Sequence, residues 1–194
     1  MNFLAHSYLS FTDDQIIGNL IGDFIKNRDK KNLREGIQQG VMLHRAIDAF
    51  TDVHPKVSEA KTVFQPLVRL YSGAFVDVVF DYFLANDAEI KTSDEWMRHT
   101  EHVYEVLYRS ENELPENFRL MLLKMKADNW LYNYRYDWGI DYSTRNVLHK
   151  AKFLTADTPV FELFLQNKPF LKSCFDDFFP DLHEFCIKMN ETFP

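Results

Sequence analysis

Apolar residues recur at helical spacing along most of the 194-residue chain. Stripes with i, i+3 and i+4 spacing predict helices over 2–9, 12–26, 36–53, 56–71, 74–84, 93–108, 115–136, 143–153 and 159–166. A Phe-rich helix should follow Pro169 and be kinked or divided at Pro180, because proline lacks a backbone donor. We find no reliable strand alternation, internal repeat or low-complexity linker. The pattern therefore predicts an all-α bundle forming one domain over residues 1–194.

The helix predicted over 36–53 combines an apolar stripe with side chains that bind metals. His44, Asp48 and Asp52 follow one another at i, i+4 and i+8, so they should stack along one helical face. Imidazole and carboxylate together suit a divalent cation such as Zn, Fe or Mn. A solvated face with capping charges is the alternative interpretation.

The helix over 74–84 carries Asp77 and Asp81 in a run that is otherwise almost entirely apolar. Buried carboxylates are rare unless they are paired, hydrogen-bonded or bound to a metal. Two on one stripe repel and drive a pKa upward unless a cation lies nearby. A structural alternative pairs each with an arginine, such as Arg45 or Arg69.

Two more candidates lie near the N-terminus. His6 falls in a short apolar helix, where it can be a core residue or a ligand. Gly18 and Gly22 lower the helix propensity of their segment, which predicts close approach of another backbone. Asp23 follows directly among apolar neighbours and is either a metal ligand or a solvent-facing acid.

Composition narrows the function classes. The chain has 18 Phe but only 6 Gly and 7 Pro, which favours helices over a turn-rich β fold. Its net charge of −7 argues against general nucleic-acid binding. The one dense basic segment, residues 26–34, is either a solvated loop or a docking surface for an acidic partner.

Cellular location is predicted from what the sequence does not contain. Cys174 and Cys186 form no CxxC pair and are expected to be apolar packing residues in a reducing compartment. The N-terminus lacks the features of a signal peptide, and no run of about eighteen apolar residues predicts a membrane span. We therefore expect a cytoplasmic protein that does not contact membranes.

Several ordered motifs resemble one known family. They are MNFLAH (1–6), GNLIGDF (18–24), GVMLHRAIDAFTDVH (40–54), DVVFDYFLA (77–85), NWLYNY (129–134) and FFPDL (178–182). Together they resemble the acyl carrier protein phosphodiesterase family over nearly the whole chain. That family is similar to the HD-type metal phosphohydrolases, helical folds in which His and Asp side chains from several helices hold a divalent cation.

The resemblance implies an activity and a cofactor. The reaction would hydrolyse the phosphodiester between 4′-phosphopantetheine and a serine of acyl carrier protein, releasing apo-protein and 4′-phosphopantetheine. Mn²⁺ is the expected ion, with Mg²⁺, Fe²⁺ or Co²⁺ as alternatives. The implied metal ligands are Asp23, His44, Asp48, Asp77 and His6, with Asp81 as a further candidate and Asp52 and His54 nearby.

One position departs from the family pattern. Members commonly read Asp-His-Phe-Leu where this chain has Asp81-Tyr82-Phe83-Leu84. If the family histidine acts in catalysis, Tyr82 would weaken or alter activity. If it only packs, tyrosine can replace it.

The remaining roles follow from phosphoester chemistry. A bound cation polarises a phosphate oxygen and lowers the pKa of its water, while Asp52 or Asp81 can orient that water as a general base. Arg45 and Arg69 can neutralise the phosphate, although Arg45 can instead pair with Asp48 or Asp77. Basic residues of the 26–34 segment would contact the acidic carrier protein; they are Lys26, Arg28, Lys30, Lys31 and Arg34.

Two other functions are also compatible with the sequence. One is an HD-like metal phosphohydrolase acting on a nucleotide or another small phosphoester. The other is a non-catalytic helical binding protein, in which Tyr82 marks lost catalysis. Either a monomer or a homodimer is compatible with the sequence.

Overall fold

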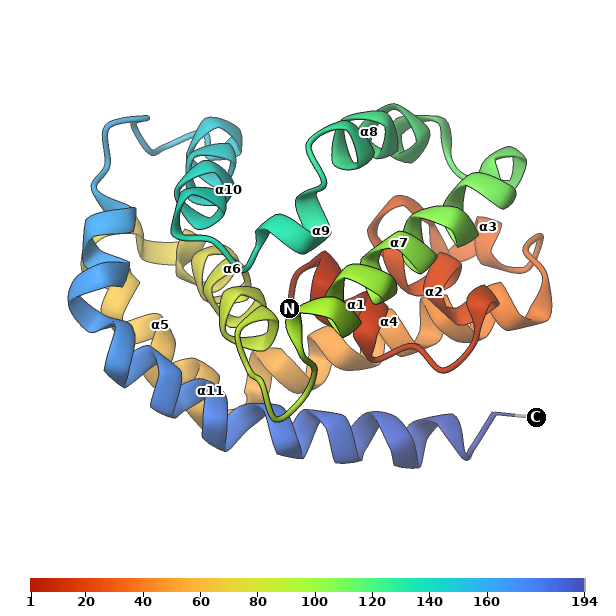
Figure 1. Cartoon of the computed structure of the whole chain (residues 1–194), viewed down its shortest axis with the longest axis horizontal. Helices are drawn as coiled ribbons and strands as arrows, with labels where there is room; N and C mark the ends of the chain where they lie inside the picture. Colours follow the sequence, from red (N-terminus) through yellow and green to blue (C-terminus); the bar gives the residue numbers. More distant parts are fainter. Residues whose placement is uncertain (194) are drawn as a thin grey trace.

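The computed structural model describes residues 1–193 and confirms the all-α fold, with no strand in that range (Figure 1). The α-helices are α1 (Phe3–Tyr8), α2 (Asp13–Leu20), α3 (Asn27–Lys30), α4 (Glu35–Val53), α5 (Pro55–Val68), α6 (Ser72–Ala85), α7 (Ser93–Arg109), α8 (Glu116–Ala127), α9 (Trp130–Asn133), α10 (Asp137–Lys150) and α11 (Val160–Asn190). Short 3₁₀ turns are η1 (Gly22–Phe24), η2 (Arg69–Tyr71) and η3 (Glu111–Glu113).

The pairing of α2 with α4 rests on two glycines. A Cβ on Gly18 would lie 2.1 Å from the Ile37 carbonyl oxygen and 2.8 Å from the Gly40 Cα. Only a residue without a side chain allows the backbones to approach so closely. The predicted close approach at Gly18 is thus present, and it places the C-terminal half of α2 against α4.

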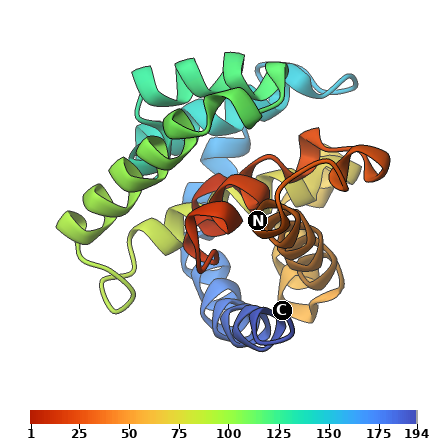
Figure 2. The ribbon, with the colours of Figure 1, turned by 90° about the vertical axis from the view of Figure 1, so that its right-hand side faces the viewer.

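Helix α11 forms the long edge of the molecule, and α1 lies across the middle. The 31 residues of α11 contact α4, α5, α6 and α10. Figure 1 shows α11 bending from the left-hand end to the lower edge. Helix α1 packs against α2 and α6. In the view turned by 90°, α1 and α4 lie side by side near the N-terminus (Figure 2). The apolar core, rich in Phe, fills the space between these helices.

Two of the predicted helices end earlier than expected. The helix over 12–26 ends at Leu20 and is followed by η1, because Gly18 and Gly22 weaken helix propensity there. The helix over 115–136 breaks at Asn129, which adopts a left-handed φ of 44°. The Tyr104 hydroxyl spans this break, donating to the Met125 carbonyl at 2.8 Å and accepting from the Leu131 amide at 3.2 Å.

The C-terminal segments also differ from the prediction. Pro169 and Pro180 both lie inside α11, so the helix predicted over 159–166 is not separate from the one after Pro169. Of the two outcomes expected at Pro180, a kink or a division, the division does not occur. Proline removes one hydrogen bond and bends a helix, and packing against four other helices keeps α11 continuous. Helix α10 begins at Asp137, six residues before the predicted start.

The stretch Pro55–Ala85 is apolar and long enough to cross a membrane by length and composition, with 44% of its most apolar window buried inside the fold. It does not form one straight rod. The rings of Phe64 and Phe75 lie 6.1 Å apart, whereas eleven residues of straight helix would separate them by about 16 Å. The chain reverses at Arg69, whose φ is 50°, so α5 and α6 pack on one another as core helices.

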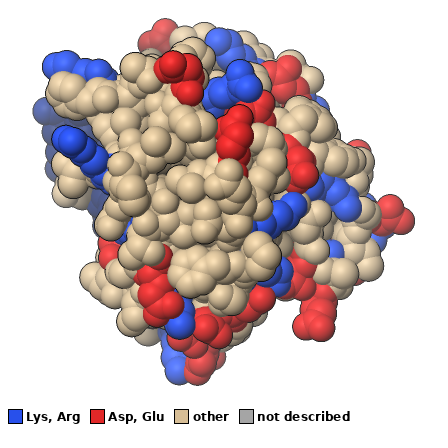
Figure 3. Space-filling view, turned by 90° about the vertical axis from the view of Figure 1, so that its left-hand side faces the viewer, with Lys and Arg blue, Asp and Glu red and all other residues tan. Residues whose placement is uncertain are grey.

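The left-hand end of the molecule shows a broad area with few charges over its centre (Figure 3). Helices α5 and α10 and the first part of α11 lie at this end (Figure 1). The structure also has a cavity lined by residues between Met1 and Asp77, and none of its lining residues belongs to those three helices. This face is therefore separate from the candidate site.

Candidate metal centre

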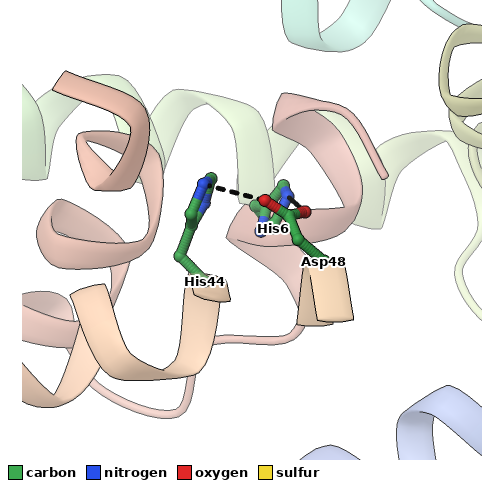
Figure 4. Close-up of side chains that lie close together, drawn as sticks. All are labelled: His6, His44 and Asp48. Carbon is green, nitrogen blue, oxygen red and sulfur yellow. Dashed lines mark ion pairs between the residues drawn. The ribbon is translucent and has the colours of Figure 1, made fainter. Parts of the chain in front are cut away.

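Side chains from two helices far apart in sequence meet at one point. His6 of α1 and His44 and Asp48 of α4 each offer a ligand atom, and these atoms all lie within 4.8 Å of one another (Figure 4). Asp48 is central, because its two oxygens lie 3.3 Å from His6 Nε2 and 3.2 Å from His44 Nε2. Atoms that share one ion at about 2.1 Å are about 3.0–3.4 Å apart. The two distances between imidazole nitrogen and Asp48 oxygen fit a single divalent cation.

Asn19 fixes which nitrogen of His6 faces the centre. Its amide nitrogen donates to the His6 carbonyl at 2.8 Å, so its oxygen must face the imidazole, 2.7 Å from His6 Nδ1. An amide oxygen only accepts, so Nδ1 carries the proton. Burial lowers the pKa of His6, so the ring is neutral near pH 7 and Nε2 presents a lone pair to Asp48. Two lone pairs at this distance favour a cation between them.

His44 is held by a glycine and by Asp23. A Cβ on Gly22 would lie 2.3 Å from both Cγ and Cδ2 of the imidazole, so the ring occupies the space that a side chain would fill. The predicted close approach at Gly22 is therefore to the His44 side chain and not to another backbone. His44 Nε2 also lies 3.2 Å from the Asp23 carboxylate, and its ring stacks on that of His6 with centroids 4.3 Å apart.

The surrounding cavity is acidic. It measures about 240 Å³ and is lined by Met1, Asn2, Phe3, His6, Asn19, Asp23, His44, Asp48, Thr51, Asp52 and Asp77. Burial opposes ionisation of Asp48, yet the neighbouring imidazoles leave its pKa below the usual value. Contact with His44 likewise lowers the pKa of Asp23. These two acids are ionised at neutral pH. Among the described residues no Lys or Arg side chain lines the cavity, and the Met1 ammonium that does is paired with Asp77. Such a site attracts a cation and repels a phosphate unless a cation is present.

Comparison with known proteins decides the family. The model of the family described as "Acyl carrier protein phosphodiesterase" matches residues 1–182. This chain belongs to the acyl carrier protein phosphodiesterase family.

Individual relatives carry the same name. A Yersinia pestis acyl carrier protein phosphodiesterase is 41% identical over 86 residues, which are 44% of this chain and 45% of that relative. One from Klebsiella pneumoniae is 32% identical over 141 residues, covering 70% of this chain and 71% of the relative. One from Photorhabdus laumondii is 28% identical over 136 residues, covering 69% of each. No solved structure matches the chain significantly.

Asp77 and Asp81 of α6 lie in different surroundings. Asp77 lines the cavity, and one of its oxygens lies 3.0 Å from the Met1 nitrogen. Asp81 is fully buried and does not line the cavity. It accepts hydrogen bonds from the amides of Asn2, Leu4 and Ala5 at 3.3, 2.8 and 3.4 Å. Burial raises the pKa of Asp81 to about 7, against the effect of these bonds.

Of the other candidate catalytic groups, only Asp52 reaches the cavity. Its carboxylate is 77% exposed and lies 3.4 Å from Lys61 Nζ. Arg45 pairs with neither Asp48 nor Asp77; its guanidinium donates to the Asn27 side chain and to the Ile25 carbonyl. These contacts fix the chain between η1 and α3 beside the site.

Arg69 and Tyr82 also lie away from the cavity lining. Arg69 is exposed in the turn between α5 and α6. The Tyr82 hydroxyl bonds to Lys168 Nζ of α11, and its ring packs on Phe164. The position at which this chain departs from the family pattern therefore faces α11.

The basic segment surrounds the short helix α3. Lys30 is half-buried, while Lys26, Arg28 and Lys31 are exposed. Arg34 already has partners within the fold, because it forms ion pairs with Asp14 at 2.9 Å and with Glu113 at 2.7 Å. Arg28 lies 3.5 Å from the Asp29 carboxylate. Helix α3 begins four residues after Asp23, which lines the cavity.

Sequence reasoning missed Asn19 and Thr51. Asn19 is fully buried inside α2. An asparagine in the middle of a predicted helix was a usable signal in the sequence, because Asn disfavours helix interiors unless its side chain has a specific partner. Thr51 lies seven residues after His44 on the same face of α4. That spacing was visible in the sequence, although Thr in a helix usually only packs.

Proposed function

We propose that this protein is a divalent-metal-dependent phosphodiesterase that removes 4′-phosphopantetheine from the serine of acyl carrier protein. The observation that supports this best is the convergence of His6, His44 and Asp48 in an acidic cavity. Family membership supplies the substrate class, since relatives of this family are named for acyl carrier protein.

We assign the ion to His6, His44 and Asp48, with Asp23 and Asp77 at its margin. Mn²⁺ is our choice of ion, since imidazole and carboxylate both suit it. The donor set fits because the neutral His6 nitrogen and the ionised Asp48 face each other without a proton between them. When bound, such an ion would polarise a phosphate oxygen and acidify a coordinated water.

The protein's own groups hold the substrate and manage the proton. Asp52 is our candidate for the general base, since it lines the cavity and is partly open to solvent. Asp81 is engaged by three backbone amides, which makes it a poorer candidate. Neither Arg45 nor Arg69 lines the cavity, so neutralisation of the phosphate would fall to the bound cation.

The carrier protein would dock through α3 and its flanks. Acyl carrier proteins are acidic, so the cations of this segment, among them the half-buried Lys30 and the exposed Lys31, would contact them beside the cavity. The double variant Lys30→Glu, Lys31→Glu should raise KM for holo-acyl carrier protein roughly tenfold at low ionic strength. The matched control is Lys152→Glu, Lys188→Glu, which makes the same charge change at exposed sites outside the cavity lining. An unchanged KM in the first variant would remove the docking proposal.

The activity itself has a direct test. Holo-acyl carrier protein is incubated with the protein and Mn²⁺, and mass spectrometry follows loss of the phosphopantetheine mass. His44→Ala should abolish the loss, and so should a chelator. A panel of nucleotides and other small phosphoesters runs in parallel. Hydrolysis of those alone would replace the carrier protein as the substrate, and no bindable divalent cation would indicate a non-catalytic protein.

A further inference from the structure

Thr51 has a hydroxyl that the fold does not use. The residue is 3% exposed, and its Oγ1 is buried without a hydrogen-bond partner among the described residues. A helical threonine commonly bonds to the carbonyl four residues earlier, and Thr51 makes no such bond. Burying a hydroxyl without a partner destabilises a protein. The hydroxyl is thus retained at a cost to stability.

The position of Thr51 points to a partner that enters from the cavity. Thr51 lines the cavity, as do His44 and Asp48 on the same face of α4. It lies one turn beyond Asp48, next to Asp52 at the open side. The acidic groups of the lining only accept hydrogen bonds when ionised. Of its donors, the Met1 ammonium pairs with Asp77 and the Asn19 amide donates to the His6 carbonyl and to Ser10, so few are left for a phosphate. The Thr51 hydroxyl can donate a hydrogen bond to a phosphate oxygen and would therefore add a donor to the cavity.

We infer that the Thr51 hydroxyl is a substrate-binding group that donates a hydrogen bond to a non-bridging oxygen of the phosphoester held in the cavity. The inference rests on the proposed function, because it takes the ligand to be a phosphoester. It adds a contact that helps to orient the phosphorus for attack from the Asp52 side.

The test compares Thr51→Val, which keeps the shape and removes the hydroxyl, with Thr51→Ser, which keeps the hydroxyl. Loss of one hydrogen bond to a charged oxygen should lower kcat/KM for holo-acyl carrier protein about ten- to hundredfold in Thr51→Val. Thr51→Ser should stay near the wild-type value. Removing an unpartnered buried hydroxyl should also raise Tm by roughly 2–4 °C in Thr51→Val. A purely structural role would not make the more stable variant the less active one.

A second measurement separates this inference from the proposed function. Binding of inorganic phosphate to Mn²⁺-loaded protein is measured by titration calorimetry for wild type and both variants. Weaker binding in Thr51→Val alone supports the inference, even if no variant hydrolyses holo-acyl carrier protein. Equal phosphate binding in wild type and Thr51→Val, or no binding by wild type, overturns it. Bound Mn²⁺ should be unchanged in both variants, and its loss in Thr51→Val would assign Thr51 to ion binding instead.

Discussion

Gly22→Ala tests whether the shape around His44 sets the metal centre. The new Cβ would lie 2.3 Å from His44 Cγ and Cδ2, against a contact distance of about 3.5 Å between carbon atoms. The ring must therefore move by roughly 1 Å. His44 Cβ would also lie only 2.8 Å from the new Cβ and does not move when the ring turns. The turn that carries Gly22 and α4 must therefore move apart as the ring rotates, and Nε2 is displaced with them.

The size of the effect follows from that displacement. Metal–ligand distances vary by only about 0.2 Å in good sites, so a shift of about 1 Å removes His44 from the ligand set. We expect Mn²⁺ affinity to fall about ten- to hundredfold, or about 1.4–2.7 kcal/mol. Overpacking should also lower stability by about 1–3 kcal/mol.

Titration calorimetry with Mn²⁺ measures the first effect and denaturant unfolding the second. Gly73→Ala is the matched control, because its Cβ would meet only the flexible Lys61 side chain, at 3.4 Å. It should bind Mn²⁺ as wild type does and be no less stable. Wild-type affinity in Gly22→Ala would show that the ion does not use His44.

Three further predictions concern the supports of the site and the core. Asn19→Ala should lower Mn²⁺ affinity about ten- to hundredfold by calorimetry, because His6 Nδ1 loses its acceptor. Gly18→Ala should destabilise the fold by about 3 kcal/mol in urea unfolding, since its Cβ would force α2 away from α4. Burial, with Lys91 and His102 nearby, lowers the pKa of His99 to about 4. Between pH 6.5 and 4 the unfolded chain binds a proton at His99 that the folded protein does not bind. His99 therefore stabilises the fold above pH 6.5, and this contribution, at most about 3 kcal/mol, is lost as pH falls from 6.5 to 4. A His99→Gln variant should lack this part of the pH dependence in unfolding measured at pH 7 and 5.

The sequence was sufficient where one helix carried the whole signal. The i, i+4 spacing of His44 and Asp48 placed them on one face of α4, and the structure has both at the cavity. The Gly18 contact was also predictable, because a glycine inside a helix usually marks close packing. Such inferences need only local geometry, which a helical period supplies.

The partners of isolated side chains were beyond reach from sequence. Arg45 was equally suited to a phosphate, Asp48 or Asp77, and it instead bonds to Asn27 and Ile25. The neighbours of a half-buried cation such as Arg45 depend on how the facing turn folds, and η1 was predicted as continuous helix. The same limit applies to Arg69, because the sequence predicts a break at residues 72–73, whereas the chain reverses three residues earlier, at Arg69.

Asp77 and Asp81 show why spacing alone cannot assign function. Both sit on α6 at i, i+4, and helical geometry gives them neighbouring directions. Yet Asp77 reaches the cavity, whereas Asp81 accepts the first amides of α1. The difference comes from α1, a six-residue helix too short to be stable alone, whose unpaired N-terminal amides need an acceptor. By supplying it, Asp81 fixes the helix that carries His6. A buried acid in this fold can therefore support the proposed metal centre without being one of its ligands.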